Sequence, residues 1–187
     1  YNQLLTKLTM EPVTNLKIEA SYAYTTYTNK IIWFSNIPEN VDTAVSHIVS
    51  SSIGYDIPFA KFHKIKTKIG YSYQLAYMGK DKLPKIGLPE HVATALLGYD
   101  FIPKNDILNS LSLNIYYTYS TPRPLTANRP LYYSDVFHDF NISPPPIWFK
   151  HLIFSMHFKN ILNKTPILSA YSVAKPFTFE FEIGYNF

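Results

Sequence analysis

Hydrophobic and polar residues alternate along the C-terminal segment Pro176–Phe187. Because successive side chains of a β-strand point to opposite faces, this segment predicts a strand with one apolar face and one polar face. The apolar face would carry Phe177, Phe179, Phe181, Ile183, Tyr185 and Phe187. The polar face would carry Thr178, Glu180, Glu182, Gly184 and Asn186. Large apolar residues opposite carboxylates suit a strand with lipid on one side and a wet lumen on the other.

The same two-residue period recurs along the chain and predicts nine strands, with few segments typical of helices. The expected strands are approximately Leu4–Met10, Asn15–Tyr27, His47–Ile57, Phe62–Tyr77, His91–Phe101, Ile107–Tyr119, Leu131–Ile142, Lys150–Asn160 and Phe177–Phe187. In the clearest one, the outward residues would be Leu111, Leu113, Ile115, Tyr117 and Tyr119, and the inward ones Ser110, Ser112, Asn114, Tyr116 and Thr118. The second strand would direct Leu16, Ile18, Ala20, Tyr22 and Tyr24 outward, and Lys17, Glu19, Ser21 and Thr25 inward.

The connections between these strands alternate in length. Four are short: Glu11–Thr14, Pro58–Lys61, Ile102–Asp106 and Ser143–Phe149. Four are longer: Thr28–Ser46, Met78–Glu90, Ser120–Pro130 and Ile161–Pro176. Outer-membrane barrels have short periplasmic turns and longer extracellular loops, so the alternation favours a membrane barrel over a soluble sheet.

An internal echo supports this register: His47–Pro58 resembles His91–Pro103. In both segments we expect a tyrosine in the lower aromatic girdle (Tyr55, Tyr99), followed by an inward aspartate (Asp56, Asp100). Either an internal duplication or the recurrence of girdle-and-turn chemistry explains the echo.

The strand count bears on the size of the barrel. Bacterial single-chain barrels have even strand numbers, so nine strands ending in a descending strand predict the C-terminal portion of a larger barrel. If Leu4–Met10 is not a strand, the remaining eight would be able to close by themselves around a filled interior. We favour the larger barrel.

Composition agrees with an interleaved membrane pattern. Hydrophobic residues make up 47%, yet the mean hydropathy is only -0.08. No apolar run approaches the roughly 20 residues that a membrane helix needs. The 16 Tyr and 13 Phe are typical of barrels with interfacial girdles. The absence of cysteine excludes a disulfide framework and thiolate metal sites. Since the lysines are scattered and the net charge is +4, we expect no nucleic-acid partner.

Five segments, in order, resemble the C-terminal barrel half of TonB-dependent outer-membrane receptors. They are the hairpin Met10–Tyr24, the strand Leu88–Asp100, Tyr132–Val136, Phe158–Lys164 and the closing strand after Ala174-Lys175-Pro176. The sequence departs from the family pattern in two places: Ile161-Leu162-Asn163 replaces the usual Leu-Phe-Asp, and Phe177 stands where an arginine commonly follows the last proline.

The resemblance implies that residues 1–187 are one barrel portion of a roughly 22-stranded barrel, with the plug domain outside this chain. It implies energised uptake of a scarce solute, such as a ferric siderophore, haem or cobalamin, across the outer membrane of a Gram-negative bacterium. The expected partners are membrane lipid, the small-molecule ligand and a TonB-type protein acting through the plug. The alternative is a passive porin or a surface-anchored adhesin. We expect no enzymatic chemistry and no cofactor.

Candidate ligand-binding residues are Arg123 and Arg129, in the predicted extracellular loop Ser120–Pro130. Guanidinium groups there would bind carboxylate- or phosphate-bearing ligands. Lys64, Lys66 and Lys68 predict an inward basic ladder, facing either an anionic plug or solute or simply the lumen water.

Two groups of residues are candidates for acid–base or metal chemistry and are not favoured. His138 should face away from Asp135 and Asp139, which excludes a convergent catalytic pair. His151 and His157 share a face but lie too far apart along one strand to bind the same metal ion.

Overall fold

The computed structural model describes residues 2–34, 37–79, 82–84, 88–101, 111–124, 137–143, 147–149, 152–164, 167–169, 172–173 and 175–185. In these residues the chain forms β-strands and no helix. The strands are β1 (Asn2–Val13), β2 (Leu16–Phe34), β3 (Ile37–Ala60), β4 (His63–Met78), β5 (Leu83–Pro84), β6 (His91–Phe101), β7 (Leu111–Ser120), β8 (Phe137–Ser143), β9 (Ile147–Phe149), β10 (Leu152–Lys159), β11 (Ile167–Ser169), β12 (Ser172–Val173) and β13 (Thr178–Tyr185).

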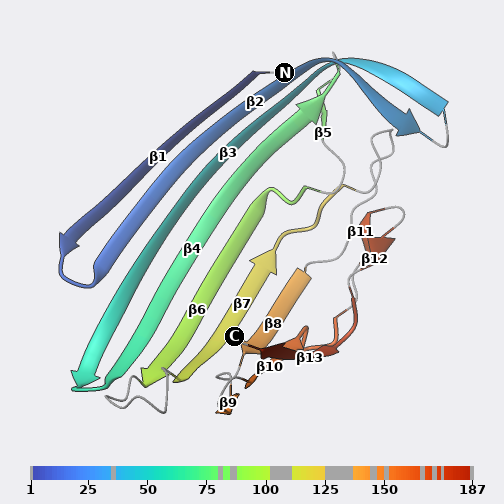
Figure 1. Ribbon diagram of the computed structural model, residues 1–187. Helices are drawn as coiled ribbons and strands as arrows, with labels where there is room; N and C mark the ends of the chain where they lie inside the picture. The colour runs from blue at the N-terminus through green and yellow to red at the C-terminus, as the bar shows by residue number, and fades with distance from the viewer. Residues whose placement is uncertain are drawn as a thin grey trace.

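Nine of these strands form one antiparallel sheet in the order β1-β2-β3-β4-β6-β7-β8-β10-β13 (Figure 1). Short β5 adds to β4, short β9 adds to β10, and β11 and β12 form a separate hairpin. Each strand of the main sheet pairs with its neighbours in the chain, which is the meander that the nine alternating segments predict. The prediction of an all-β antiparallel fold is therefore confirmed, and so is the order of its strands.

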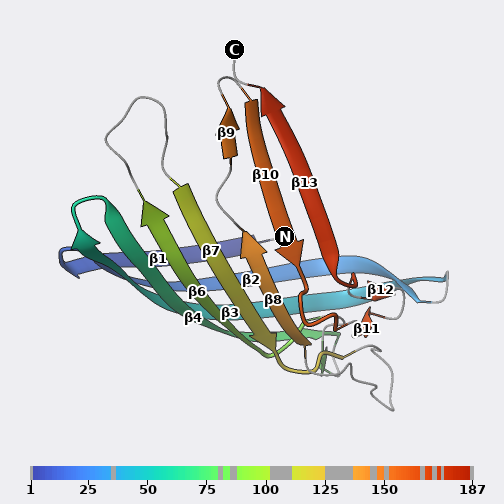
Figure 2. The same ribbon diagram turned by 90° about the horizontal axis from the view of Figure 1, so that it is seen from below.

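The sheet is open in the described part of the chain. β1 pairs only with β2, and β13 pairs only with β10. Figure 2 shows the strand directions turning progressively from β1–β3 to β10 and β13, so the sheet is strongly twisted and curved. The two unpaired edges leave the closure of a barrel as a proposal.

Turn chemistry explains the hairpins at one end of the sheet. Val13 pairs with Leu16, so the β1–β2 turn consists of Thr14 and Asn15. Asn15 has a φ of 68°, a left-handed conformation that asparagine tolerates better than most residues. The β3–β4 turn is equally tight, because Ala60 pairs with His63. The short connections predicted at Glu11–Thr14 and Pro58–Lys61 are thus even shorter in the structure.

One predicted loop is wrong. Thr28–Ser46 is not a loop for most of its length, because β2 and β3 continue to pair as far as Phe34 opposite Ile37. The distal part of this hairpin projects beyond the upper ends of β1 and β4 in Figure 1. Alternation missed it because Ile31-Ile32-Trp33-Phe34 is a continuous apolar run, and backbone pairing across the hairpin does not require alternation.

Other connections differ in detail. The predicted connection Met78–Glu90 contains β5, Ser143–Phe149 contains β9, and Ile161–Pro176 contains the β11–β12 hairpin. The predicted turn Ile102–Asp106 lies outside the described residues, as does most of Ser120–Pro130.

The sheet has almost no hydrophobic core of its own. Among the described residues, the only buried hydrophobic side chains are Ala44 and Met78. No second layer of the described chain packs on either face of the sheet. The side chains available for binding or for contact with the surroundings therefore lie on the two faces of the sheet.

Candidate functional site

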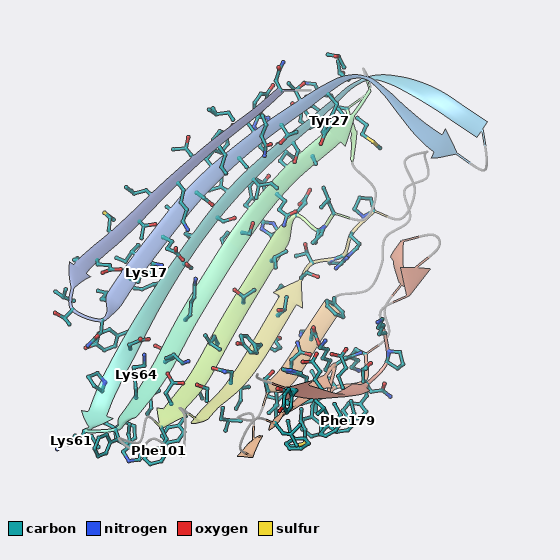
Figure 3. All side chains as sticks on the ribbon, in the orientation of Figure 1. Lys17, Tyr27, Lys61, Lys64, Phe101 and Phe179 are labelled. Atoms are coloured by element: carbon teal, nitrogen blue, oxygen red, sulfur yellow. The ribbon has the colours of Figure 1, made fainter. Side chains whose placement is uncertain are left out.

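The cross-strand register separates the side chains of the sheet into two faces, drawn as sticks in Figure 3. One face, the apolar face, carries most of the aliphatic and aromatic residues of each strand. On the four best-paired strands it consists of Leu4, Thr6, Leu8 and Met10 (β1), Leu16, Ile18, Ala20, Tyr22 and Tyr24 (β2), His47, Val49, Ser51, Ile53, Tyr55 and Ile57 (β3), and Ile65, Thr67, Ile69, Tyr71, Tyr73 and Leu75 (β4). For β2, the residues on the apolar face are those that the alternation predicted to share one face.

The apolar face is widely exposed. Ile69 is 64% exposed, Leu97 is 53% exposed and Ile183 is 62% exposed, although all three lie in paired strands. Soluble monomers rarely expose contiguous apolar patches larger than a few hundred Å². The apolar face extends from β1 to β13, so it needs an apolar cover.

Four tyrosine–histidine hydrogen bonds lie on the apolar face. Each joins a tyrosine hydroxyl to a histidine Nδ1: Tyr22–His47 at 2.9 Å, Tyr99–His63 at 2.7 Å, Tyr71–His91 at 2.6 Å and Tyr117–His138 at 2.7 Å. In every case the histidine pairs across the strands with an aromatic residue two positions from the bonded tyrosine: Tyr24, Phe101, Tyr73 and Tyr119, respectively. The hydroxyl of each bonded tyrosine and the Nδ1 of its histidine are thus paired within an apolar surface.

Three of these histidines follow a regular line. His91 is in register with Val49, which lies two residues beyond His47 on β3. His138 is in register with Ala93, which lies two residues beyond His91 on β6. Each step crosses two strands, so the line shifts by one residue per strand. We call this line the upper aromatic line.

A second line runs parallel to the first. Tyr99 on β6 is in register with Ile57, which lies two residues beyond Tyr55 on β3. Tyr55 and Tyr99 therefore follow the same shift of one residue per strand and form the lower aromatic line. On β3 and β6 the two lines are separated by eight residues, from His47 to Tyr55 and from His91 to Tyr99. The internal echo of the sequence is the repeat of this spacing.

The polar face carries ion pairs. The carboxylate of Glu19 contacts three ammonium groups: Lys7 Nζ at 3.0 Å, Lys17 Nζ at 3.3 Å and Lys68 Nζ at 2.9 Å. The side chain of Glu19 is 17% exposed, whereas those of the lysines are 59%, 51% and 47% exposed. We call these four residues the Glu19 cluster. It holds one negative and three positive charges.

A second ion-pair cluster lies nearer the turn between β3 and β4. Lys64 Nζ lies 3.1 Å from Asp56 and 3.7 Å from Asp100, and Lys66 Nζ lies 2.8 Å from Asp100. Asp100 is buried and also accepts a hydrogen bond from Ser112. Both aspartates lie on the polar face, opposite to Tyr55 and Tyr99, as the alternation predicts. The predicted ladder is split, since Lys64 and Lys66 are balanced by these aspartates and Lys68 belongs to the Glu19 cluster.

Asn160, within the predicted family segment Phe158–Lys164, ties the loop after β10 to the chain before β13. Its side-chain Nδ2 donates to the carbonyl oxygens of Lys164 and Lys175, both at 2.7 Å, and its Oδ1 accepts from Lys164 N at 3.1 Å. Asn163 Oδ1 accepts from Phe177 N at 2.9 Å. Both asparagines have a φ of 50°. The sequence resemblance identified this segment. The role of its asparagines became evident only from their hydrogen bonds in the structure.

Of the two candidate ligand-binding arginines, only Arg123 lies within the described residues. Arg123 follows β7, donates from Nη2 to Ser120 Oγ at 3.1 Å, and lies 6.0 Å from the centre of the Phe137 ring. Burial lowers the pKa of its guanidinium, which still keeps its charge at neutral pH. Arg129 lies outside the described residues. Ligand binding by either residue stays a prediction.

Of the candidate acid–base group around His138, the described members His138 and Asp139 lie on opposite faces of the sheet. His138 lies on the apolar face with Tyr117, whereas Asp139 lies on the polar face and accepts from Asn141 Nδ2 at 3.0 Å. Asp135 and His151 lie outside the described residues, and His157 Nδ1 bonds to Ser143 Oγ at 3.0 Å.

The described residues contain no group of three or more histidine, aspartate or glutamate residues positioned to hold a metal ion. The same residues contain no helix of the length and apolar character needed to cross a membrane.

No model of a known protein family matches this chain, and no curated protein sequence matches it. The function must therefore be argued from the two faces and from the sequence resemblance.

Proposed function

We propose that this chain is part of the wall of a transmembrane β-barrel in the outer membrane of a Gram-negative bacterium. On this proposal the apolar face contacts lipid and the polar face lines a wet lumen. The observation that carries the proposal is the pair of parallel aromatic lines on the apolar face.

The slope of the lines supports a barrel. A shift of one residue, about 3.3 Å, across a strand spacing of about 4.8 Å inclines each line by about 35° to the perpendicular of the strands. Strands of outer-membrane barrels tilt by about 35–45° from the barrel axis. A line with this slope is therefore level in the membrane plane, which is the course that an interfacial aromatic girdle follows.

The separation of the lines supports a membrane. Eight residues span about 26 Å along a strand. At a tilt of about 40° this corresponds to a height of about 20 Å, close to the apolar band of roughly 25 Å between the girdles of known barrels. The residues between the lines are mostly aliphatic or small, including Val49 and Ile53 on β3 and Ala93, Ala95 and Leu97 on β6.

The open edges agree with a larger barrel. Unpaired backbone groups at a strand edge cannot be satisfied by water within a bilayer. β1 and β13 would each need a further strand as a partner, so that the described sheet is an arc of the roughly 22-stranded barrel that the family resemblance implies.

Within this class we propose a role in energised uptake of a scarce solute, such as a metal chelate, by a TonB-dependent receptor. The support for this step is the ordered set of five sequence segments. A passive pore would need the same two faces, so the test must measure energy coupling.

The test is uptake by cells that carry the complete receptor gene, with and without the proton-motive force. Membrane fractionation first checks that the protein reaches the outer membrane. We expect uptake to stop when the proton-motive force is collapsed. Outer-membrane protein with unchanged uptake after collapse would contradict the receptor role in favour of a passive pore.

A further inference from the structure

The Glu19 cluster combines three features that favour anion binding. It carries a surplus of two positive charges, its lysines are about half exposed, and its single carboxylate lies beneath them. Like charges repel, so three ammonium groups stay together only because Glu19 contacts all of them. Glu19 therefore preorganises a group of cations on the polar face.

The cluster borders a hollow in the polar face. The hollow has a volume of about 400 Å³, and its lining includes Lys7, Lys68 and Glu19 of the cluster but not Lys17. The lining also includes the small residues Ser50, Ser52, Ser72 and Gly70 and the apolar residues Leu5 and Val92. A Cβ added at Gly70 would meet Thr94 Oγ1 at 2.7 Å, so a larger residue there would require the Thr94 side chain to move.

The hollow offers the groups that bind anions. Each lysine ammonium has three N–H donors, of which the contact with Glu19 uses one. Of the serine hydroxyls, Ser52 donates to Glu19 at 3.3 Å, and Ser50 and Ser72 are hydrogen-bonded to each other at 3.0 Å, so the lysines supply most of the donors for an anion. The neighbouring cluster of Lys64, Lys66, Asp56 and Asp100 has balanced charges and offers no such surplus.

We propose that the Glu19 cluster and its hollow form a binding site for small polyanions that bear phosphate or carboxylate groups. This inference rests on the proposed function, because it takes the polar face to line the passage of the solute. It names the class of solute that the wall favours.

The test uses the complete barrel that contains this chain, refolded in detergent, with inorganic pyrophosphate as the probe and maltose as a neutral control in titration calorimetry. We expect saturable binding of pyrophosphate that weakens as the salt concentration rises, and no saturable binding of maltose. The double variant Lys7→Gln/Lys68→Gln should weaken pyrophosphate binding about tenfold or more, since hydrogen bonds between charged groups are lost.

The matched control is Lys61→Gln/Lys164→Gln, which removes the same charge from two turns outside the Glu19 cluster. It should change the affinity by less than about twofold, because surface charges at a distance are screened. Equal losses in both double variants, or no preference for pyrophosphate over maltose, would overturn the inference. Insertion of the complete barrel into liposomes is measured separately. A protein that inserts without binding contradicts this inference alone, and one that binds without inserting contradicts the proposed function alone.

Discussion

The two faces of the sheet satisfy their side chains in opposite ways. On the polar face, charged and hydroxyl groups meet partners from neighbouring strands, as Lys68 meets Glu19 and Ser72 meets Ser50. On the apolar face, large residues such as Ile69 and Ile183 lie exposed with little to cover them. On the proposed membrane placement, the polar face lies in water and the apolar face in lipid. The difference between the faces is what that proposal explains.

The largest expected effect comes from a charge on the apolar face. Ile69→Arg lies between the two aromatic lines, with Ile53 and Ala95 as its cross-strand partners. A lipid-facing arginine near the middle of the membrane costs about 2–4 kcal/mol, and folding into liposomes under a urea titration should measure that loss.

The control for this substitution is Ser72→Arg, three residues away on the polar face of the same strand. It removes the Ser50–Ser72 hydrogen bond, worth about 1 kcal/mol, but leaves the arginine in water. Equal destabilisation by the two arginines would mean that the faces do not differ in their surroundings.

The next largest effect concerns the hydrogen bonds of Asn160 in the connection between β10 and β13. Asn160→Ala removes the side chain that bridges Lys164 and Lys175, and leaves two carbonyl oxygens without their donors. We expect a loss of about 2 kcal/mol in the free energy of unfolding, because Asn160 is buried and several hydrogen bonds disappear together. Asn163→Ala, at an exposed position whose side chain accepts a hydrogen bond from Phe177 N, should cost less. A larger loss at Asn163 would contradict the bridging role of Asn160.

The smallest effect tests the tyrosine–histidine pairs. Tyr71→Phe removes the hydrogen bond to His91 Nδ1 and should cost about 1 kcal/mol. Tyr73 contacts the same imidazole ring, at 5.3 Å between ring centres, but its hydroxyl makes no hydrogen bond to the described residues. Tyr73→Phe should therefore be nearly neutral in the same urea titration. Similar costs for both substitutions would argue against a specific role of the Tyr71–His91 pair.

The sequence predicted what depends on local alternation. The nine strands, their order, and the faces of β2 and β7 followed from the two-residue period. Successive side chains of a strand point to opposite faces, so the face of one residue determines the face of the next. The extension of β2 and β3 to Phe34 and Ile37 was missed, since it depends on backbone pairing between distant residues.

The sites depend on register as well as on alternation. The Glu19 cluster draws its residues from three strands, β1, β2 and β4, and its charge surplus follows from which lysine meets which carboxylate. The upper aromatic line likewise requires the pairing of β3, β4, β6, β7 and β8. A one-residue slip between any two strands would reverse the faces, so neither feature can be predicted without the register.

The most direct test of the central claim is the accessibility of the two faces in a bilayer. The complete barrel is used, and since residues 1–187 contain no cysteine, Ile69→Cys or Ser72→Cys gives this part of the wall a single spin label. In liposomes, we expect the label at position 69 to collide mainly with oxygen dissolved in lipid, and the label at position 72 mainly with a water-soluble nickel complex. If position 69 is as accessible to the nickel complex as position 72, the apolar face does not contact lipid and the proposed membrane wall is wrong.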